Sequence, residues 1–314
     1  MTELMKLLIS ESGLSEYSVR RIAASAPDAY KEYYIPKRNG GFRRIAQPAK
    51  EVKVLQRALV DRLLSDLPIH DAAIAYRKGR SIRDNALVHA GTTQILKMDF
   101  ENFFPSILDS DWRKFCEANS ILDSNEDLHL STQILFHRPR GSRKLRLAIG
   151  APSSPMLSNL LMFDFDRKIT ELLRPDNVTY SRYADDLTFS APRTGYLTSV
   201  KKAVREALNS LLYPKLSINH AKTTYVTTKY SRRVTGLTLA NDGRVTIGRH
   251  RKRLIRAGIH NFLVGTHEAE DLRWLAGMIS FVKSAEPEFY ENLIAEVGFE
   301  QLKEILRRGS VATR

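Results

Sequence analysis

Cysteine is almost absent from the chain, and long apolar runs are missing altogether. Cys116 is the one cysteine among 314 residues, which excludes intramolecular disulfides and cysteine-based zinc sites and fits a reducing compartment. Hydrophobic residues make up 43% of the sequence, yet no uninterrupted run of them approaches the length of a membrane span. The opening MTELMKLLISESGL carries early acids and lacks a clear cleavage site, which indicates a helix rather than a signal peptide. We therefore expect a cytoplasmic globular protein with no membrane association.

Acidic residues are scarce relative to basic ones. Lys and Arg number 49 against 35 Asp and Glu, which gives a formal net charge of +14 and a pI near 9.8. Such a charge favours a polyanionic partner, although a basic protein with no special partner would share it. The clustering of basic residues favours a polyanionic partner, because residues 229–256 contain one acid, Asp242, and many bases. The basic residues of this segment are Lys229, Arg232, Arg233, Arg244, Arg249, Arg251, Lys252, Arg253 and Arg256.

Periodicity predicts a mixed chain of helices and strands. Residues 3–25 indicate one or two helices, and two β-prone runs at 30–36 and 42–47 flank Asn39-Gly40-Gly41, a strong hairpin signal. Apolar residues at helical spacing predict helices near 51–67, after Gly150 as one long helix, and over 199–212. Three short amphipathic helices are expected near 251–264, 272–284 and 287–308.

Acids stand at two unusual places in this pattern. In NVTYSRYADDLTFSAP, Asp185 and Asp186 lie between two strand-like runs, and in TTQILKMDFENFFPSI an apolar run ends at Asp99. If the two strands pair, the three carboxylates converge at one rim of a sheet. Such a cluster suits Mg²⁺, a hard cation that prefers carboxylate and phosphate oxygens, and two such ions serve both polymerases and nucleases. Taken alone, Asp99 would more often be a helix cap or turn residue.

Ordered motifs around these acids resemble those of reverse transcriptases. Tyr183-Ala184-Asp185-Asp186 is similar to their YxDD signature, residues 96–107 to their first catalytic motif, and GAPSSPMLSNL to the segment before their palm helix. LSINHAKT, which contains Lys222, resembles a later motif. Asn85 to His89 matches the NAxxH pattern, and Val234-Thr235-Gly236 the VTG pattern, of bacterial retron reverse transcriptases. The matches extend over roughly residues 33–256.

The resemblance implies an α+β right-hand polymerase with fingers, an antiparallel-sheet palm and a small helical thumb. The corresponding divisions are 1–95 for the N-terminal helices and fingers, 96–235 for the palm with part of the fingers, and 236–314 for the thumb. After the thumb only the tail RRGSVATR follows, so RNase H, endonuclease or toxin activity is expected to come from other proteins.

The resemblance also implies roles at the nucleotide site. Asp99 and Asp185 would be the main ligands of two Mg²⁺ ions, for which Mn²⁺ could substitute, with Asp186 and the backbone carbonyl of Phe100 assisting. Further residues would bind the deoxynucleoside triphosphate: Phe104 as a steric gate against the 2′-OH, Arg43 on the triphosphate, Lys37 or Arg38 near the γ-phosphate, Lys222 as proton donor to pyrophosphate, and Gly150 and Ala151 by close backbone approach. Phe104 could instead be a core aromatic, and the basic hairpin tip could be merely solvated. The family commonly has Pro-Gln-Gly where this chain has Ala148-Ile149-Gly150, which puts nucleotide affinity and fidelity in doubt.

A third set of residues would contact primer, template or the RNA partner. Tyr183 is expected near the primer terminus, and the remaining candidates are Tyr76, Arg77, Arg80, Asn85, His89, Val234, Thr235, Gly236, Arg251, Lys252 and Arg253, with Arg232 and Arg233 as a basic loop. Asn85 and His89 could alternatively belong to a capped helix with a satisfied histidine or shape a nearby pocket.

Membership of the retron group would imply more than polymerisation. Its enzymes copy a cognate structured non-coding RNA into single-stranded DNA, starting from the 2′-OH of an internal guanosine, to give a branched RNA–DNA molecule called msDNA. Such systems resemble anti-phage defence modules with a separate effector protein, and host RNase H would remove template RNA. The alternatives are an intron-encoded or diversity-generating reverse transcriptase and an RNA-binding scaffold that restrains a partner effector.

Overall fold

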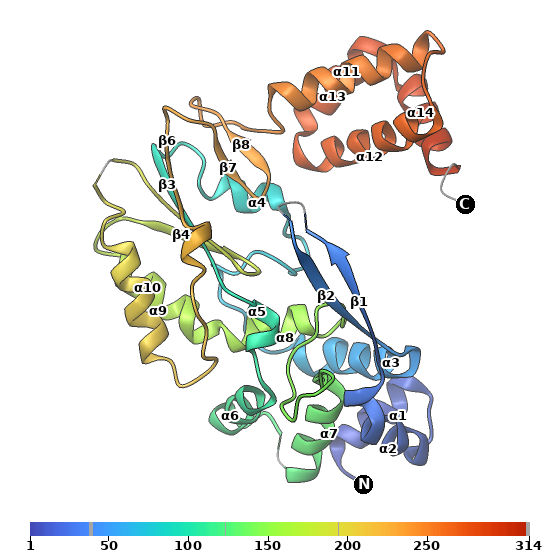
Figure 1. Ribbon diagram of the computed structural model, residues 1–314, viewed down its shortest axis with the longest axis vertical. Coiled ribbons are helices and arrows are strands. Elements are labelled where there is room, and N and C mark those ends of the chain that lie inside the picture. The colour runs from blue at the N-terminus through green and yellow to red at the C-terminus, as the bar shows by residue number, and fades with distance from the viewer. Residues whose placement is uncertain (38–39, 123, 194, 312–314) are drawn as a thin grey trace. The chain divides into compact units, whose positions relative to one another are not determined.

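The computed structural model describes residues 1–37, 40–122, 124–193 and 195–311, so the predicted roles of Arg38 and of Asn39 in the hairpin turn fall outside it. The chain forms two compact units (Figure 1). Unit 1 comprises residues 1–78, 97–187 and 198–224, and unit 2 comprises residues 79–96, 188–197 and 225–314. Within the described ranges, no helix is both long enough and apolar enough to cross a bilayer.

Unit 1 begins with the predicted helices and hairpin. Helices α1 (Glu3–Ser12) and α2 (Glu16–Ser25) start at Thr2 and Ser15, whose side chains accept hydrogen bonds from first-turn backbone N–H groups. Strands β1 (Tyr30–Pro36) and β2 (Phe42–Pro48) pair antiparallel, which confirms the predicted hairpin. Helix α3 (Lys50–Leu59) follows and continues as a π-helical turn over Val60–Leu64.

The remaining helices of unit 1 are α5 (Phe103–Ser106), α6 (Asp109–Asn119), α7 (Asn125–Leu135), α8 (Ser154–Leu161), α9 (Phe163–Leu173) and α10 (Val200–Ser210), followed by a 3₁₀ turn over His220–Lys222. The prediction of one long helix after Gly150 was wrong, because α8 ends and α9 begins at Met162, whose backbone has ψ 1°. A single non-helical residue barely disturbs the spacing of the apolar stripe, so periodicity does not reveal the break.

A four-stranded sheet has the order β4-β5-β3-β6. Its members are β3 (Gln94–Asp99), β4 (Thr179–Tyr183), β5 (Asp186–Ala191) and β6 (Thr224–Thr227). Because β4 and β5 are neighbours joined by only Ala184 and Asp185, they form a tight antiparallel hairpin. The central pair, β5 and β3, is buried along most of its length and carries the predicted acids at its ends.

Unit 2 joins a small sheet to a bundle of helices. Strands β7 (Arg232–Val234), β8 (Leu237–Leu239) and β9 (Val245–Thr246) pair antiparallel, and α4 (Ile82–Leu87) packs on them. Helices α11 (Arg249–Leu263), α12 (Ala269–Ala285), α13 (Pro287–Val297) and α14 (Phe299–Val311) follow. The third predicted C-terminal helix was wrong in extent, because Gly298 at φ 88° separates α13 from α14.

The two motifs typical of retrons meet in the core of unit 2. Asn85 and His89 are 1% and 0% exposed, and the His89 Nδ1 atom lies 2.7 Å from the hydroxyl of Ser190 on β5. Val234 is also 0% exposed, and the Thr235 hydroxyl donates to the Ile82 carbonyl at 2.8 Å. Neither Asn85 nor His89 has a side-chain surface to present to RNA in this arrangement. The alternative of a capped helix with a satisfied histidine fits, since Ser81 and Asp84 form a capping box on α4.

Burial makes His89 a pH-sensitive part of this core. It lowers the pKa of the His89 imidazole to about 3, so the folded protein disfavours the proton that the unfolded chain binds below its ordinary pKa of 6.5. The stability of the wild type therefore falls as pH drops from about 6.5 toward 3. We expect His89→Gln to be less stable than wild type at pH 7.5, with the gap narrowing by about 2 kcal/mol at pH 5, measured by chemical denaturation.

Ser190→Ala is the matched control, because it removes the partner hydroxyl and keeps the buried imidazole. It should retain the pH slope of the wild type. A gap between His89→Gln and wild type that does not change with pH would contradict the prediction.

Candidate active site

The predicted convergence of the acids is confirmed by the backbone. Strands β3 and β5 are neighbours, and the N–H of Phe100 donates to the carbonyl of Asp185 at 3.0 Å. This bond joins the end of β3, where Asp99 lies, to the turn that carries Asp185 and precedes Asp186. Carboxylates from segments far apart in sequence are thereby held at one rim of the sheet.

A second backbone contact brings Lys222 to the same place. Phe100 and Ile218 form an antiparallel bridge, in which Asn219 N–H donates to the Asp99 carbonyl at 2.7 Å. The 3₁₀ turn that follows places Lys222 Nζ 2.9 and 3.0 Å from the two carboxylate oxygens of Asp99. The later motif and the first motif are thus adjacent in space, as the resemblance implied.

Like charges perturb the acids. Burial, and then the neighbouring charge of Asp99, raise the pKa of the Asp185 carboxyl. Burial raises the pKa of Asp186 to about 6, with Asp185 and Asp99 adding to the effect and the ammonium of Lys97 opposing it. The hydrogen bond to Asp99 raises the pKa of Lys222 above its ordinary value, so this pair strengthens the preference of the lysine for its cationic form.

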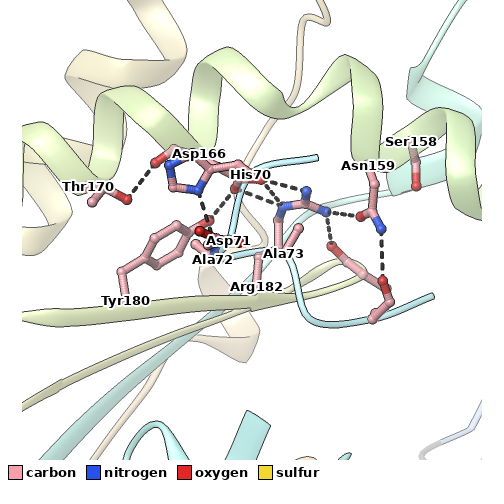
Figure 2. Close-up of polar contacts among 12 residues, drawn as sticks. His70, Asp71, Ala72, Ala73, Ser158, Asn159, Asp166, Thr170, Tyr180 and Arg182 are labelled. Atoms are coloured by element: carbon pink, nitrogen blue, oxygen red, sulfur yellow. Dashed lines mark hydrogen bonds and ion pairs between the residues drawn. The ribbon is translucent and has the colours of Figure 1, made fainter. Parts of the chain in front are cut away.

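A buried ion pair between Arg182 and Asp166 supports the turn that carries Asp185 and Asp186. Ala184 adopts φ 58°, a left-handed conformation that costs a residue with a Cβ roughly 1 kcal/mol. Arg182 Nη1 donates to the Ala184 carbonyl at 3.2 Å, while Nε and Nη2 bind both oxygens of Asp166 on α9 at 2.6 to 3.1 Å. Both side chains of the pair are fully buried. Figure 2 shows Asp166, Asn159 and Tyr180 around the Arg182 guanidinium.

The carboxylate oxygens of this site are the kind of ligand that a hard cation prefers, but their present arrangement does not enclose an ion. The three carboxylates, of which Asp185 and Asp186 have raised pKa values, provide the oxygen ligands and negative field that Mg²⁺ requires. Across the described residues, however, no three His, Cys, Asp or Glu side chains converge closely enough to enclose an ion. Both oxygens of Asp99 are engaged by Lys222, so binding of a metal ion there would require this pair to separate.

Three of the residues predicted to hold the nucleotide, Arg43, Gly150 and Ala151, lie on or against β2. The carbonyl of Ile149 accepts a hydrogen bond from Ala46 N–H at 2.9 Å, which places Gly150 against this strand. A Cβ on Gly150 would lie 2.9 Å from the Ala46 carbonyl oxygen, and its φ is 121°, so glycine is required. Ala151 packs with Ala46 in a small apolar cluster. Arg43 lies exposed on the same strand, within electrostatic reach of Asp185.

Aromatic side chains border the acids. The Phe104 ring is partly exposed and lies 5.4 Å from the Phe103 ring and 6.4 Å from the Tyr76 ring. Tyr76 adopts φ 63°, and burial followed by the charge of Asp185 raises its pKa. Tyr183 is partly exposed, and burial raises its pKa as well. Tyr76, which was predicted to contact the template strand, therefore lies beside Phe104, the predicted steric gate.

Several residues that were predicted to contact nucleic acid are buried or already bonded to other groups of the protein. Arg232 is 1% exposed and donates to the Leu239 and Ala240 carbonyls and the Asn241 side chain, which contradicts its prediction as an RNA-binding loop residue. Arg77 folds back toward the carbonyls of residues 70 and 73. In unit 2, Arg251 donates to the carbonyl of Gly236 at 2.9 Å and Lys252 binds Glu286 at 2.5 Å.

Other predicted contacts keep an exposed surface. Arg80 and Arg253 are exposed, as are Lys37 at the end of β1 and the basic neighbour Arg233.

Sequence reasoning missed four residues that shape the site. Lys97 stands two positions before Asp99 on β3, and Asn159, Asp166 and Arg182 form the network beneath the turn. A signal for the last pair was present, because Asp166 interrupts an apolar helical stripe and Arg182 interrupts a buried strand. A buried acid and a buried base of this kind must find one another.

Neutralising Asp186 should stabilise the protein when no divalent metal is present. Its raised pKa means that the folded state disfavours the charged form, a cost that grows as pH rises from about 4 to about 6 and stays constant above. We expect Asp186→Asn to unfold about 1 to 2 kcal/mol less readily than wild type at pH 7.5, a gain that shrinks toward pH 4.5.

Chemical denaturation in the presence of a chelator measures this difference. Asp99→Asn is the control, since it removes the ion pair with Lys222 and should show no comparable gain. Loss of stability in Asp186→Asn at pH 7.5 would overturn the electrostatic interpretation.

Comparisons with known proteins agree with this geometry. Residues 35–239 match the family model described as reverse transcriptase (RNA-dependent DNA polymerase). The retron Ec83 reverse transcriptase of Escherichia coli is 37% identical over 278 residues, covering 88% of this chain and 89% of that protein. The retron Ec73 reverse transcriptase of Escherichia coli is 32% identical, covering 88% and 90%.

Among solved structures, the telomerase of Candida albicans in complex with a telomeric RNA fragment matches 93% of this chain and 61% of its own at 14% identity, with a TM-score of 0.49. That likeness is too weak to add to the assignment. The family model and the relatives suffice for it: the chain belongs to the reverse transcriptase family and, within it, to the retron reverse transcriptases, which are RNA-directed DNA polymerases with the α+β right-hand fold.

Proposed function

We propose that this polymerase copies a cognate structured non-coding RNA into single-stranded DNA, beginning at the 2′-OH of an internal guanosine and producing branched RNA–DNA. The observation that carries the proposal is the meeting of Asp99, Asp185 and Asp186 beside Lys222 in a chain that belongs to the retron group. The net charge of +14 supports a polyanionic partner of considerable size.

In this proposal each residue at the acid cluster has a chemical task. Asp99 and Asp185 would hold two Mg²⁺ ions, or Mn²⁺ in their place, with Asp186 and the Phe100 carbonyl assisting. When bound, such ions activate the attacking hydroxyl and stabilise charge on the phosphate. The attacking hydroxyl loses its proton to water, its oxygen forms a bond to the α-phosphorus of the deoxynucleoside triphosphate, and the bond to the leaving pyrophosphate oxygen breaks.

Two cationic side chains would serve the same transfer. Arg43 extends from β2 within electrostatic reach of Asp185, and it would bind the triphosphate. Lys222 is protonated at neutral pH, as lysine ordinarily is, and Asp99 raises its pKa further. Once freed from Asp99, its ammonium could donate that proton to the pyrophosphate as it leaves.

Selection of deoxynucleotides is assigned to Phe104. Its ring packs on Phe103 and remains partly exposed beside Tyr76, so it can present a face to an incoming sugar. A bulky ring at that place collides with a 2′-OH and tolerates a 2′-hydrogen.

Phe104→Ala should therefore increase ribonucleotide incorporation by about 10-fold or more relative to deoxynucleotide incorporation, since removal of a steric block typically changes discrimination by a few kcal/mol. Primer extension with each nucleotide class measures the ratio of the two kcat/KM values. Phe103→Ala, a change to the buried neighbouring ring, serves as the matched control. Unchanged sugar discrimination in a folded Phe104→Ala protein would refute the gate assignment.

Recognition of the RNA is assigned to unit 2. A groove there is lined by basic side chains that include Arg83, Arg233, Arg249 and Arg251. Arg253 follows on α11 with an exposed side chain. Cations spaced along one groove favour the phosphate backbone of a nucleic acid. Lys252, held by Glu286 and over the Phe289 ring, and Arg251, held by Gly236, would act partly by keeping α11 in place.

The same proposal covers the cellular setting. Acting in the cytoplasm, the enzyme and its RNA–DNA product would restrain a separate effector protein in anti-phage defence, and host RNase H would remove the copied RNA. The divisions into fingers (1–95), palm (96–235) and thumb (236–314) would describe how the chain surrounds the duplex. The second candidate, an RNA-binding scaffold in which synthesis is secondary, is favoured only by the basic groove. An intron-encoded or diversity-generating role has less support than the retron relatives give to the first proposal.

The test is co-expression of the protein with the RNA encoded next to its gene, comparing wild type with Asp185→Ala. Wild type should yield a DNA strand that remains attached to RNA until a debranching enzyme is added, and Asp185→Ala should yield none because a main acid of the cluster is lost. Electrophoresis of the extracted nucleic acid before and after debranching gives the result.

Primer extension from an ordinary 3′-OH separates the two parts of the proposal. If wild type extends such a primer yet never forms a branched product, polymerisation stands and the branched priming is wrong. If Asp185→Ala still forms branched DNA, the assignment of the acid cluster is wrong.

A further inference from the structure

The turn that carries the acid pair has an unusual backbone, and something must hold it. Ala184 lies at φ 58° between β4 and β5, and only Asp185 stands between it and the first residue of β5. A left-handed residue with a Cβ persists where its surroundings determine it. Because Asp185 and Asp186 follow directly, a change in the Ala184 peptide would displace both carboxylates.

The buried guanidinium of Arg182 donates a hydrogen bond to the Ala184 peptide. Its Nη1 atom donates to the Ala184 carbonyl at 3.2 Å and to Asn159 Oδ1 at 3.1 Å. Its Nε and Nη2 atoms are occupied by Asp166, with the shortest contact at 2.6 Å. Arg182 and Asp166 are both 0% exposed, so the arrangement has no freedom to swing into solvent.

The same network reaches the aromatic border of the site. Asn159 on α8 uses its other end to donate to the Ala75 carbonyl at 2.8 Å, immediately before Tyr76. The backbone of Arg182 pairs with the same segment, since its N–H donates to the Ala72 carbonyl and its carbonyl accepts from Ile74 N–H. Figure 2 shows the segment from His70 to Ala73 beside Arg182 on one side, with Asp166 and Asn159 on the helical side.

A buried ion pair is a poor device for stability alone. Desolvation of both charges offsets most of their attraction, and well-packed apolar residues can replace such a pair without loss of stability. The planar fork of arginine, by contrast, can bind a carboxylate with one edge and a carbonyl with a remaining arm, which a lysine cannot do. The geometry therefore serves orientation better than it serves stability.

We infer that Arg182, oriented by Asp166 and Asn159, is a positioning residue that fixes the Ala184 peptide and thereby the placement of Asp185 and Asp186. It touches no substrate and acts only through the turn. Removing its arm to Ala184 while keeping the fold should misplace the acids, and a misplacement of about 1 Å can lower a rate by about 100-fold.

The experiment compares three variants in primer extension on a simple RNA template. Arg182→Lys keeps a cation near Asp166 and removes the fork. The double variant Asp166→Leu with Arg182→Met replaces the pair by apolar side chains, and we expect it to fold because it leaves neither charge buried without its partner. Tyr180→Phe is the matched control, because it removes one hydrogen bond to Asp166 Oδ1 and leaves the arm to Ala184 intact.

We expect Arg182→Lys and the double variant to lose about 10- to 100-fold in kcat, with KM for the nucleotide changed less than about 3-fold and a higher divalent-metal concentration needed for half-maximal rate. Hydrogen–deuterium exchange on the metal-free protein gives a readout apart from activity. Protection over residues 183–187 should fall in both variants and remain in Tyr180→Phe.

The melting temperature separates positioning from stability. A double variant that melts like wild type and still loses kcat and local protection supports the inference. A double variant that is folded and has wild-type kcat, metal requirement and exchange overturns it, as does a loss of activity in Tyr180→Phe equal to that in Arg182→Lys.

Discussion

Three carboxylates must lie close together although their charges repel one another, and the site in unit 1 is organised around that constraint. Asp99 ends one strand and Asp185 precedes the next, and a backbone hydrogen bond between these segments fixes them side by side. Burial adds to the cost, and it raises the pKa of Asp186 to about 6. Cations at defined places, Lys222 on Asp99 and Lys97 near Asp186, offset part of the repulsion. A cluster of this kind stores free energy that a cationic ligand would release.

Because repulsion would push the acids apart, the chain that carries them needs a rigid support. The support is buried and polar: Arg182 joins the turn at Ala184 to Asp166 and Asn159 on two successive helices. Asn159 and Asp166 lie on the two helices that meet at Met162, and both bind the Arg182 guanidinium.

In unit 2 the residues that are typical of the retron subfamily are buried, whereas the cations that could bind a ligand are exposed. Asn85, His89 and Val234 belong to or adjoin its core, and their burial shows that sequence marks of a family can be packing positions. Exposed cations such as Arg233 and Arg253 surround that core instead. The fold thereby uses one set of residues to hold the sheet and helices together and another to present positive charge.

The sequence by itself predicted strands β1 to β5, most helices, the hairpin and the order of the acidic motifs, because period and turn chemistry are local properties. It also predicted that Asp99 and Asp185 would meet if their strands paired, and the order of the surrounding motifs favoured that pairing. Only the tertiary structure decided that Arg232 is buried, that His89 faces Ser190, and that Arg182 grips the acid-bearing turn. Periodicity tells which side of an element faces inward, but the partner that covers that side comes from a distant part of the chain. The free energy of burying a charge depends on that partner, so only the folded chain could reveal it.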